Sequence, residues 1–208
     1  MRNNKMKEIL PDIYTWHEFS KEKQLNFNGY LLIGEEESVL IDPPRMSEKS
    51  FALMEKLVKK NSNHPLNTIL LTNIHHERAC DEFRRVFGAK IWINENDNLG
   101  MEGAADKTFK DGDRLPCGLV ALNIKNQKSP GESALFLEER GVMIVGDALI
   151  GKVPGKINML PSDKYRDPVL AKKRLDKILD YDFDILLVGD GESILKNAKE
   201  AVKIFFEN

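Results

Sequence analysis

Two histidines and a glutamate that could bind a metal lie together in the segment "LLTNIHHERACDEF", residues 70–83. An apolar run ends here, and His75, His76 and Glu77 follow it directly, before a stretch with helical spacing. Imidazole and carboxylate groups on a loop after a strand are common ligands of zinc and of harder divalent ions. Arg78, however, is a fixed cation where a further ligand would be expected. The segment is therefore a metal site, a changed metal site, or a turn that holds two histidines.

Polar residues follow apolar runs at three further places in the chain. Lys128 comes after "LNIKNQ", Asp147 after "GVMIVG" and Asp190 after "DILLVG". Functional side chains are often carried by loops that a rigid sheet holds in place. Because the ends of several strands can meet at one edge of a sheet, we expect all these residues to lie near His75 and His76.

Strands and helices must position these residues, and both are readable in the sequence. Residues 28–44, "NGYLLIGEEESVLIDPP", predict a β-hairpin, and helical spacing follows from about residue 47. Further strands are expected at "NTILLTN", "KIWIN", "GLVALNI", "SALFLEE", "GVMIVGD" and "FDILLVGDG", and further helices at about 77–87, 167–180 and 192–206. The strand runs are apolar enough to be covered on both faces. This order predicts an α/β fold, an αββα sandwich of two mixed sheets, in a single domain of residues 1–208.

The composition and net charge of the chain argue against some classes of binding partner. The 208 residues carry a net charge of -2, with 31% charged residues, so no field draws the chain to nucleic acid or to an anionic membrane. We expect a small-molecule ligand or a protein partner, and the absence of a long apolar run predicts a cytoplasmic protein. Two cysteines are too few for a disulfide framework. Cys80, near the start of a helix, is a candidate nucleophile, although a buried reduced thiol is the simpler interpretation.

The polar loops resemble the motifs of the metallo-β-lactamase superfamily. In that family T-H-x-H-x-D-H follows a strand, H-[ST]-P-G precedes another strand, and G-D and G-H-G end two later strands. The corresponding places here read "TNIHHER", "KSPG", "GDAL" and "GDG", and "GYLLIGEEESVLIDPP" is similar to the opening hairpin of the family. The likeness extends from about residue 26 to the C-terminal helix. The resemblance implies the αββα fold and a family chemistry in which two divalent ions are held by imidazoles and carboxylates.

The metal-binding positions of this pattern are changed in the present chain. In chain order they fall on Asn73, His75, Glu77, Arg78, Lys128, Asp147 and Asp190. Only His75 and Asp147 keep the family residue, and His76 falls on a variable position. Arg78 and Lys128 cannot coordinate zinc while they are protonated. We therefore expect no zinc pair, and we interpret these loops as a rebuilt metal site in which the two cations pair with the carboxylates of Glu77, Asp147 and Asp190.

Two functions from different classes remain open. The first is a protein without a zinc pair that binds a small ligand or a partner in the former active-site cleft. The second is a hydrolase of an ester, thioester or phosphoester, with one manganese, iron or magnesium ion held by His75, Glu77, Asp147 and Asp190. An intermediate version is metal-free acid/base chemistry by His75 or His76 with Asp147.

Each of these residues also has a purely structural interpretation. The two histidines could be hydrogen-bonded to backbone, and Asp147 could cap a turn. Asp190 could lie at the N-cap of the last helix, and Arg78 and Lys128 taken singly would be surface charges.

Overall fold

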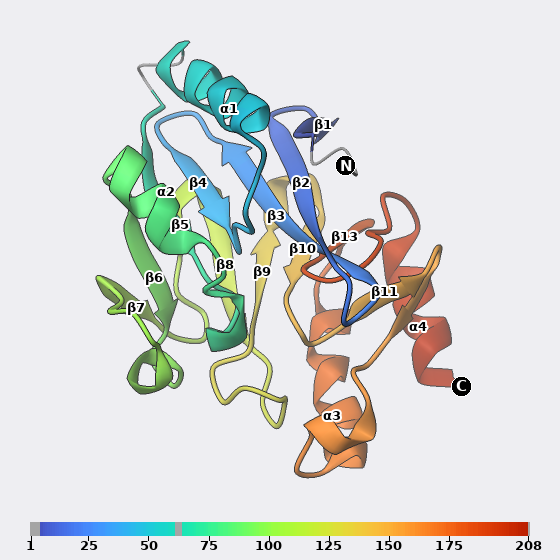
Figure 1. Ribbon diagram of the computed structural model, residues 1–208. Helices are drawn as coiled ribbons and strands as arrows, with labels where there is room; N and C mark the ends of the chain where they lie inside the picture. Colours follow the sequence, from blue (N-terminus) through green and yellow to red (C-terminus); the bar gives the residue numbers. More distant parts are fainter. Residues whose placement is uncertain (1–4, 61–63, 208) are drawn as a thin grey trace.

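Two β-sheets stack face to face, with helices on both outer sides (Figure 1). The computed structural model describes residues 5–60 and 64–207, and within these ranges the first sheet has seven strands. In spatial and chain order they are β1 (Lys7–Leu10), β2 (Ile13–Ser20), β3 (Leu25–Ile33), β4 (Ser38–Ile41), β5 (Leu66–Leu70), β6 (Lys90–Asn94) and β7 (Lys107–Phe109). Strands β1 to β4 pair antiparallel, and β4 to β7 pair parallel, so this sheet is mixed.

The second sheet contains the β-meander that the sequence predicts. Its strands are β8 (Leu119–Asn123), β9 (Ser133–Leu137), β10 (Val142–Val145) and β13 (Ile185–Val188), in the spatial order β13-β10-β9-β8. The meander is antiparallel, whereas β13 joins β10 in parallel. A separate ribbon is formed by β11 (Ile150–Val153) and β12 (Lys156–Asn158).

Alternating side chains divide the core into layers. Along β4, Val39 and Ile41 face the second sheet, and Leu40 faces the helices. Along β10 the same alternation sends Val142 towards the first sheet and Met143 towards the helices on its own side. This two-residue period lets each sheet bury both faces. The predicted αββα sandwich is thereby confirmed.

Helices cover the outer face of each sheet. Helices α1 (Glu48–Lys60) and α2 (Cys80–Phe87) lie over the first sheet, and α3 (Pro168–Arg174) and α4 (Ala198–Glu207) lie on the side of the second (Figure 1). None of the helices within the described ranges is long and apolar enough to cross a membrane.

Several boundaries differ from the sequence-based expectation. Helix α2 begins at Cys80 rather than near Glu77, because the backbone of Arg78 has a positive φ of 42° that no α-helix continues. Helix α4 begins at Ala198, so Asp190 is not at its N-terminus. Val169 of α3 is apolar but 82% exposed, so it does not pack against the sheet. Strands β1, β2, β7, β11 and β12 were not predicted as separate elements.

Candidate functional site

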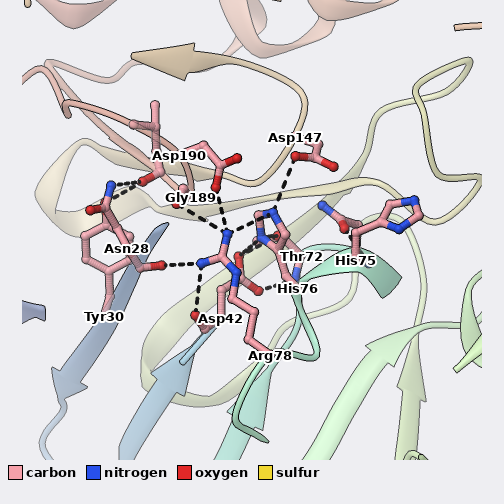
Figure 2. A network of polar contacts seen from close by, with 12 residues as sticks. Asn28, Tyr30, Asp42, Thr72, His75, His76, Arg78, Asp147, Gly189 and Asp190 are labelled. Carbon is pink, nitrogen blue, oxygen red and sulfur yellow. Dashed lines mark hydrogen bonds and ion pairs between the residues drawn. The ribbon is translucent and has the colours of Figure 1, made fainter. Parts of the chain in front are cut away.

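His76 lies at the centre of a buried polar cluster. It ends the short 3-10 helix η1 (Ile74–His76) after β5, and it is only 2% exposed. Its Nδ1 is 2.8 Å from Oδ2 of Asp42 at the end of β4, and its Nε2 is 3.5 Å from Oδ1 of Asp147 after β10. The carboxylate of Asp42 also accepts hydrogen bonds from the backbone N–H of Thr72 at 2.8 Å and from its hydroxyl at 2.6 Å. Two carboxylates therefore hold one buried imidazole (Figure 2).

The charge state of His76 follows from these neighbours. Burial lowers its pKa and so does the Arg78 guanidinium, but the carboxylates of Asp42 and Asp147 outweigh both and raise the pKa of His76 to about 10. The imidazole is then protonated at neutral pH and has no lone pair for a metal or a substrate proton. In this state His76 is a cation of the cluster rather than a base.

Arg78 links the loop after β5 to β3 and to the loop after β13. Its Nη1 donates to the backbone oxygen of Asn28 at 2.8 Å, and its Nη2 donates to Oδ1 of Asp190 at 2.7 Å (Figure 2). Nη2 is also 3.2 Å from Nε2 of His76. This approach of two cations is compensated by Asp190 beside the guanidinium and by Asp147 beside the imidazole. The guanidinium thus lies among the nitrogen and oxygen atoms that would coordinate a metal ion.

Lys128 forms the second cation-carboxylate pair. Its Nζ is 2.7 Å from Oδ2 of Asp147, and its side chain is 27% exposed. Burial alone would raise the pKa of Asp147, but the hydrogen bond and charge of His76, and then the charge of Lys128, hold that pKa well below its usual range. Asp190 behaves differently, because burial outweighs His76 and Arg78 and raises its pKa. Asp147 is therefore the more firmly ionised of the two carboxylates.

Asp97 links the loop that carries His76 to the loop that carries Lys128. This buried carboxylate accepts from the backbone N–H of Ile74 at 3.0 Å and of Gly131 at 2.7 Å, and also from the Ser129 hydroxyl. A Cβ at Gly131 would lie 2.5 Å from Cγ of Asp97, so only glycine permits this approach. The glycine of the "KSPG" segment thus serves an anchor shared by two loops.

Two buried polar atoms beside Asp147 have no hydrogen-bond partner among the described residues. They are Nδ2 of Asn73 and Oε2 of Glu132. The other oxygen of Glu132 accepts from the backbone N–H of Ala148 at 3.1 Å. Burial, and then the charge of Asp147, raise the pKa of Glu132 well above its ordinary value, which favours a neutral acid. Asn73, at the first metal position of the family pattern, caps η1 through a 2.8 Å bond from the backbone N–H of His75 to its Oδ1.

His75 and Glu77 lie outside the hydrogen-bonded cluster. The side chain of His75 points away from the network (Figure 2), is exposed, and lines the cleft. Burial of part of the ring and the charge of Lys128 lower the pKa of His75, so this imidazole is neutral at pH 7. Glu77 instead accepts from the backbone N–H of Glu102 at 3.1 Å and lines a separate hollow. The predicted pairing of Glu77 with the two cations is wrong, because Arg78 pairs with Asp190, Lys128 pairs with Asp147, and Glu77 is held by the backbone of Glu102.

Cys80 does not meet the requirements of a nucleophile. It is buried at the start of α2, and burial, followed by the charges of Asp81 and Glu77, raises its pKa to about 12. Its thiol therefore stays protonated, since only a lowered pKa would supply thiolate near neutral pH. The simpler interpretation as a buried thiol fits the structure.

A cleft of about 280 Å³ opens over the cluster. Its charged lining includes Arg78, Lys128, Asp147 and Asp190. Three exposed lysines and an apolar wall complete it, and these are Lys23, Lys152, Lys164, Leu25, Phe27, Ile150, Leu160 and Pro161. Leu160, Pro161 and Lys164 come from the loop before α3, which therefore overhangs the site.

Sequence reasoning missed several residues that build this site. Asn28 donates through Nδ2 to the backbone oxygens of Val188 and Gly191, each at 2.8 Å, and so joins β3 to the loop of Asp190. Asp42 follows the apolar strand "SVLI" in the same way that Asp147 follows "VMIV". The signal that found Asp147, a polar residue directly after an apolar run, could therefore have found Asp42.

The donor atoms do not fit a pair of zinc ions. One imidazole and two carboxylates, from His76, Asp147 and Asp190, lie within 4.8 Å of one another and form the only such group of three among the described residues. Arg78 and Lys128 already neutralise the two carboxylates, and further divalent charge would lie beside two fixed cations. The predicted metal set also included His75 and Glu77, but the structure brings His76 to that place.

Known structures and families share this fold. The family model described as "Metallo-beta-lactamase superfamily" matches residues 6–207. The structure of DIM-1 metallo-beta-lactamase exposed to ceftazidime aligns with a TM-score of 0.78 and 13% identity, covering 99% of this chain and 97% of that chain. FIM-1 from Pseudomonas aeruginosa, in its mono-zinc form, aligns with a TM-score of 0.74 and 13% identity, covering 100% and 97%.

A metallo-beta-lactamase family protein from Thermus thermophilus aligns with a TM-score of 0.67 and 20% identity, covering 96% of this chain and 80% of that chain. At these identities the structural likeness shows the fold alone. A search of curated proteins found no sequence match. The family match over nearly the whole chain, together with the αββα sandwich, shows that this protein belongs to the metallo-β-lactamase superfamily.

Proposed function

We propose that this protein binds a small ligand in the former active-site cleft, at a site where side-chain cations have replaced the metal pair. One observation carries the proposal. Nη2 of Arg78 lies 2.7 Å from Asp190 and 3.2 Å from His76, among the three atoms best placed to hold a metal. Ligand binding is preferred over binding of a partner protein because the cluster opens into a concave cleft.

Physical chemistry explains how such a replacement is stable. Removing a carboxylate from water without a partner costs several kcal/mol, on the order of the penalty for any buried ion. Around His76 the carboxylates of Asp42, Asp147 and Asp190 face three cations, since the imidazole itself is protonated. This balance of charge requires no metal.

Metal titration tests the proposal directly. We expect isothermal titration with zinc, manganese and iron(II) to show no stoichiometric tight binding, and elemental analysis after refolding with an excess of each to find less than one equivalent. We also expect no nitrocefin hydrolysis at an ordinary enzymatic rate. Two equivalents of zinc per chain, or rapid nitrocefin turnover, would overturn the proposal.

A second candidate is a hydrolase with a single hard divalent ion. The close grouping of His76, Asp147 and Asp190 favours it. Binding would require His76 to lose its proton and Arg78 to leave the cluster. An esterase, thioesterase or phosphoesterase activity that appears with manganese and disappears with a chelator would select this function. The same activity, unchanged by the chelator, would indicate metal-free acid/base chemistry through the neutral imidazole of His75.

A further inference from the structure

The cleft concentrates positive charge on a chain that is slightly negative overall. Its lining holds five lysine and arginine side chains, and these are Lys23, Arg78, Lys128, Lys152 and Lys164. Only two carboxylates, those of Asp147 and Asp190, line it in return. The whole chain has a net charge of -2, so the excess is local to this site. A concave surface lined by one sign of charge attracts ligands of the opposite sign.

The two carboxylates are already paired and do not neutralise the exposed lysines. Asp190 is paired with Arg78 at 2.7 Å, and Asp147 with Lys128 at 2.7 Å. The guanidinium is also held by backbone oxygens, so it is committed to the cluster. Lys128 is different, because its ammonium has three N–H donors, makes one carboxylate contact and lines the cleft.

Three separate segments supply the remaining lysines. Lys23 lies in the turn before β3, Lys152 lies in β11, and Lys164 ends the 3-10 helix η5 (Ser162–Lys164). Lys23 and Lys164 contact the neighbouring carboxylates of Glu22 and Asp163, but such exposed pairs bind weakly. Lys152 has no ion pair within the part of the chain that the structure describes. These ammonium groups are available to a ligand.

The remaining wall of the cleft is apolar. Leu25 and Phe27 come from β3, and Ile150, Leu160 and Pro161 belong to the same lining. A volume of about 280 Å³ is close to the lower end of the range for small-molecule sites. The site therefore offers apolar contact and positive charge within the span of one small molecule.

We propose that the ligand is a small organic anion, whose apolar body lies along Leu25 and Phe27 and whose carboxylate or phosphate group contacts Lys128, Lys152 and Lys164. This inference rests on the proposed metal-free site and adds the chemical class of its ligand. The partly buried Arg78 belongs to the framework of the site, and the lysines provide recognition.

Calorimetric titration with 1-naphthyl phosphate tests this class, with 1-naphthol and inorganic phosphate as separate probes. Each of these two carries only one of the two recognised features. We expect 1-naphthyl phosphate to bind at least about tenfold more tightly than either of them, and we expect added salt to weaken its binding. Benzoate-type probes such as 1-naphthoate distinguish a carboxylate preference from a phosphate preference. If 1-naphthol bound as tightly as 1-naphthyl phosphate and 1-naphthoate, the inference would be overturned.

A matched pair of double variants locates the effect. Lys152→Gln with Lys164→Gln removes two charges from the cleft, and Lys49→Gln with Lys56→Gln removes two exposed charges from α1. Figure 1 shows α1 at the top of the molecule, over the first sheet, and β11 lower down on the side of α4. We expect the cleft variant to weaken binding by about tenfold and the α1 variant to change it by less than about twofold, as screening of distant charges predicts. An equal effect of both would contradict the inference.

The same titration separates the two proposals. Repeating it with a chelator, and then with zinc, shows whether binding needs a metal. Binding that is lost with the chelator and restored by zinc overturns the metal-free site, even if the lysines matter. Absence of binding of both 1-naphthyl phosphate and 1-naphthoate under all three conditions overturns the ligand class, and it leaves the metal titration to decide the proposed function.

Discussion

The two cations of the site are held in very different ways. Arg78 is 10% exposed, donates to three backbone oxygens and to Asp190, and lies 4.8 Å from the ring centroid of Phe27. Lys128 is 27% exposed, and its ammonium contacts a single carboxylate. A planar guanidinium with five donors can satisfy several fixed acceptors at once, whereas an ammonium on a flexible stem can keep donors for a ligand. One cation has become part of the fold and the other has remained at the surface of the cleft.

Removing Arg78 should cause the largest loss of stability. We expect Arg78→Ala to lower the free energy of unfolding at pH 7 by about 3 to 5 kcal/mol, because Asp190 and buried carbonyl groups lose their partner. Chemical denaturation measures this loss. Arg84→Ala, which removes an exposed pair with Asp106, should cost only about 0 to 1 kcal/mol. A loss below about 1 kcal/mol for Arg78→Ala would remove the distinction between the two cations.

Alkaline pH should weaken the cluster through His76. The pKa of this imidazole is raised from 6.5 to about 10, so its charge stabilises the fold fully below about pH 6.5. That contribution is lost as pH rises towards about 10. We expect the loss to be on the order of 2 to 3 kcal/mol. Urea denaturation measures the free energy of unfolding at each pH. We expect this free energy to fall more steeply with rising pH for the wild type than for His76→Gln. Equal slopes for the two proteins would contradict the account.

Removing Lys128 should have a smaller effect. We expect Lys128→Met to cost about 1 to 2 kcal/mol at pH 7, because Asp147 keeps its contact with His76 and the side chain is partly exposed. The pKa of Asp147 is lowered from 3.8, so its pairing stabilises the fold above about pH 3.8 and fades as pH falls below that value. Acid should therefore narrow the gap between wild type and variant. If Lys128→Met lowered the stability as much as Arg78→Ala, the two cations would not differ in how firmly they are held.

Replacing both cations by histidine should restore part of the metal site. We expect the double variant Arg78→His with Lys128→His to bind zinc at least about tenfold more tightly than the wild type, which corresponds to about 1.4 kcal/mol. Calorimetry with zinc measures the change. The matched control is the double variant with glutamine at the same two positions, which removes the charges without adding imidazoles. Equal zinc affinity of the two variants would show that the positions are not former ligand positions.

The layering of the fold could be predicted because it depends on a short-range pattern. In β4 and β10 apolar residues occupy both faces, and this requires cover on both sides whatever the rest of the chain does. The antiparallel meander likewise follows from strands joined by short turns. Helix boundaries were less predictable, because the backbone turn at Arg78 delays α2 by about three residues and helical spacing alone does not show it.

The identity of the buried histidine could not be predicted from spacing. His75 and His76 are neighbours, and in a 3-10 helix successive side chains point about 120° apart. The cap that Asn73 places on the backbone N–H of His75 fixes the rotation of that turn, so His76 points inward and His75 outward. Asp42 was missed for a related reason. It lies 30 residues before Thr72, and only the parallel pairing of β4 with β5 brings them together.

The bond between Arg78 and Asp190 spans 112 residues of chain and joins the loop after β5 to the loop after β13. A bridge of this kind is encoded in the polypeptide itself and is complete when the two loops meet. Its assembly does not wait for an ion to be delivered, and a chelator cannot remove it. A cell that is starved of transition metals would therefore produce this protein with the same bond between the two loops as a cell that is well supplied.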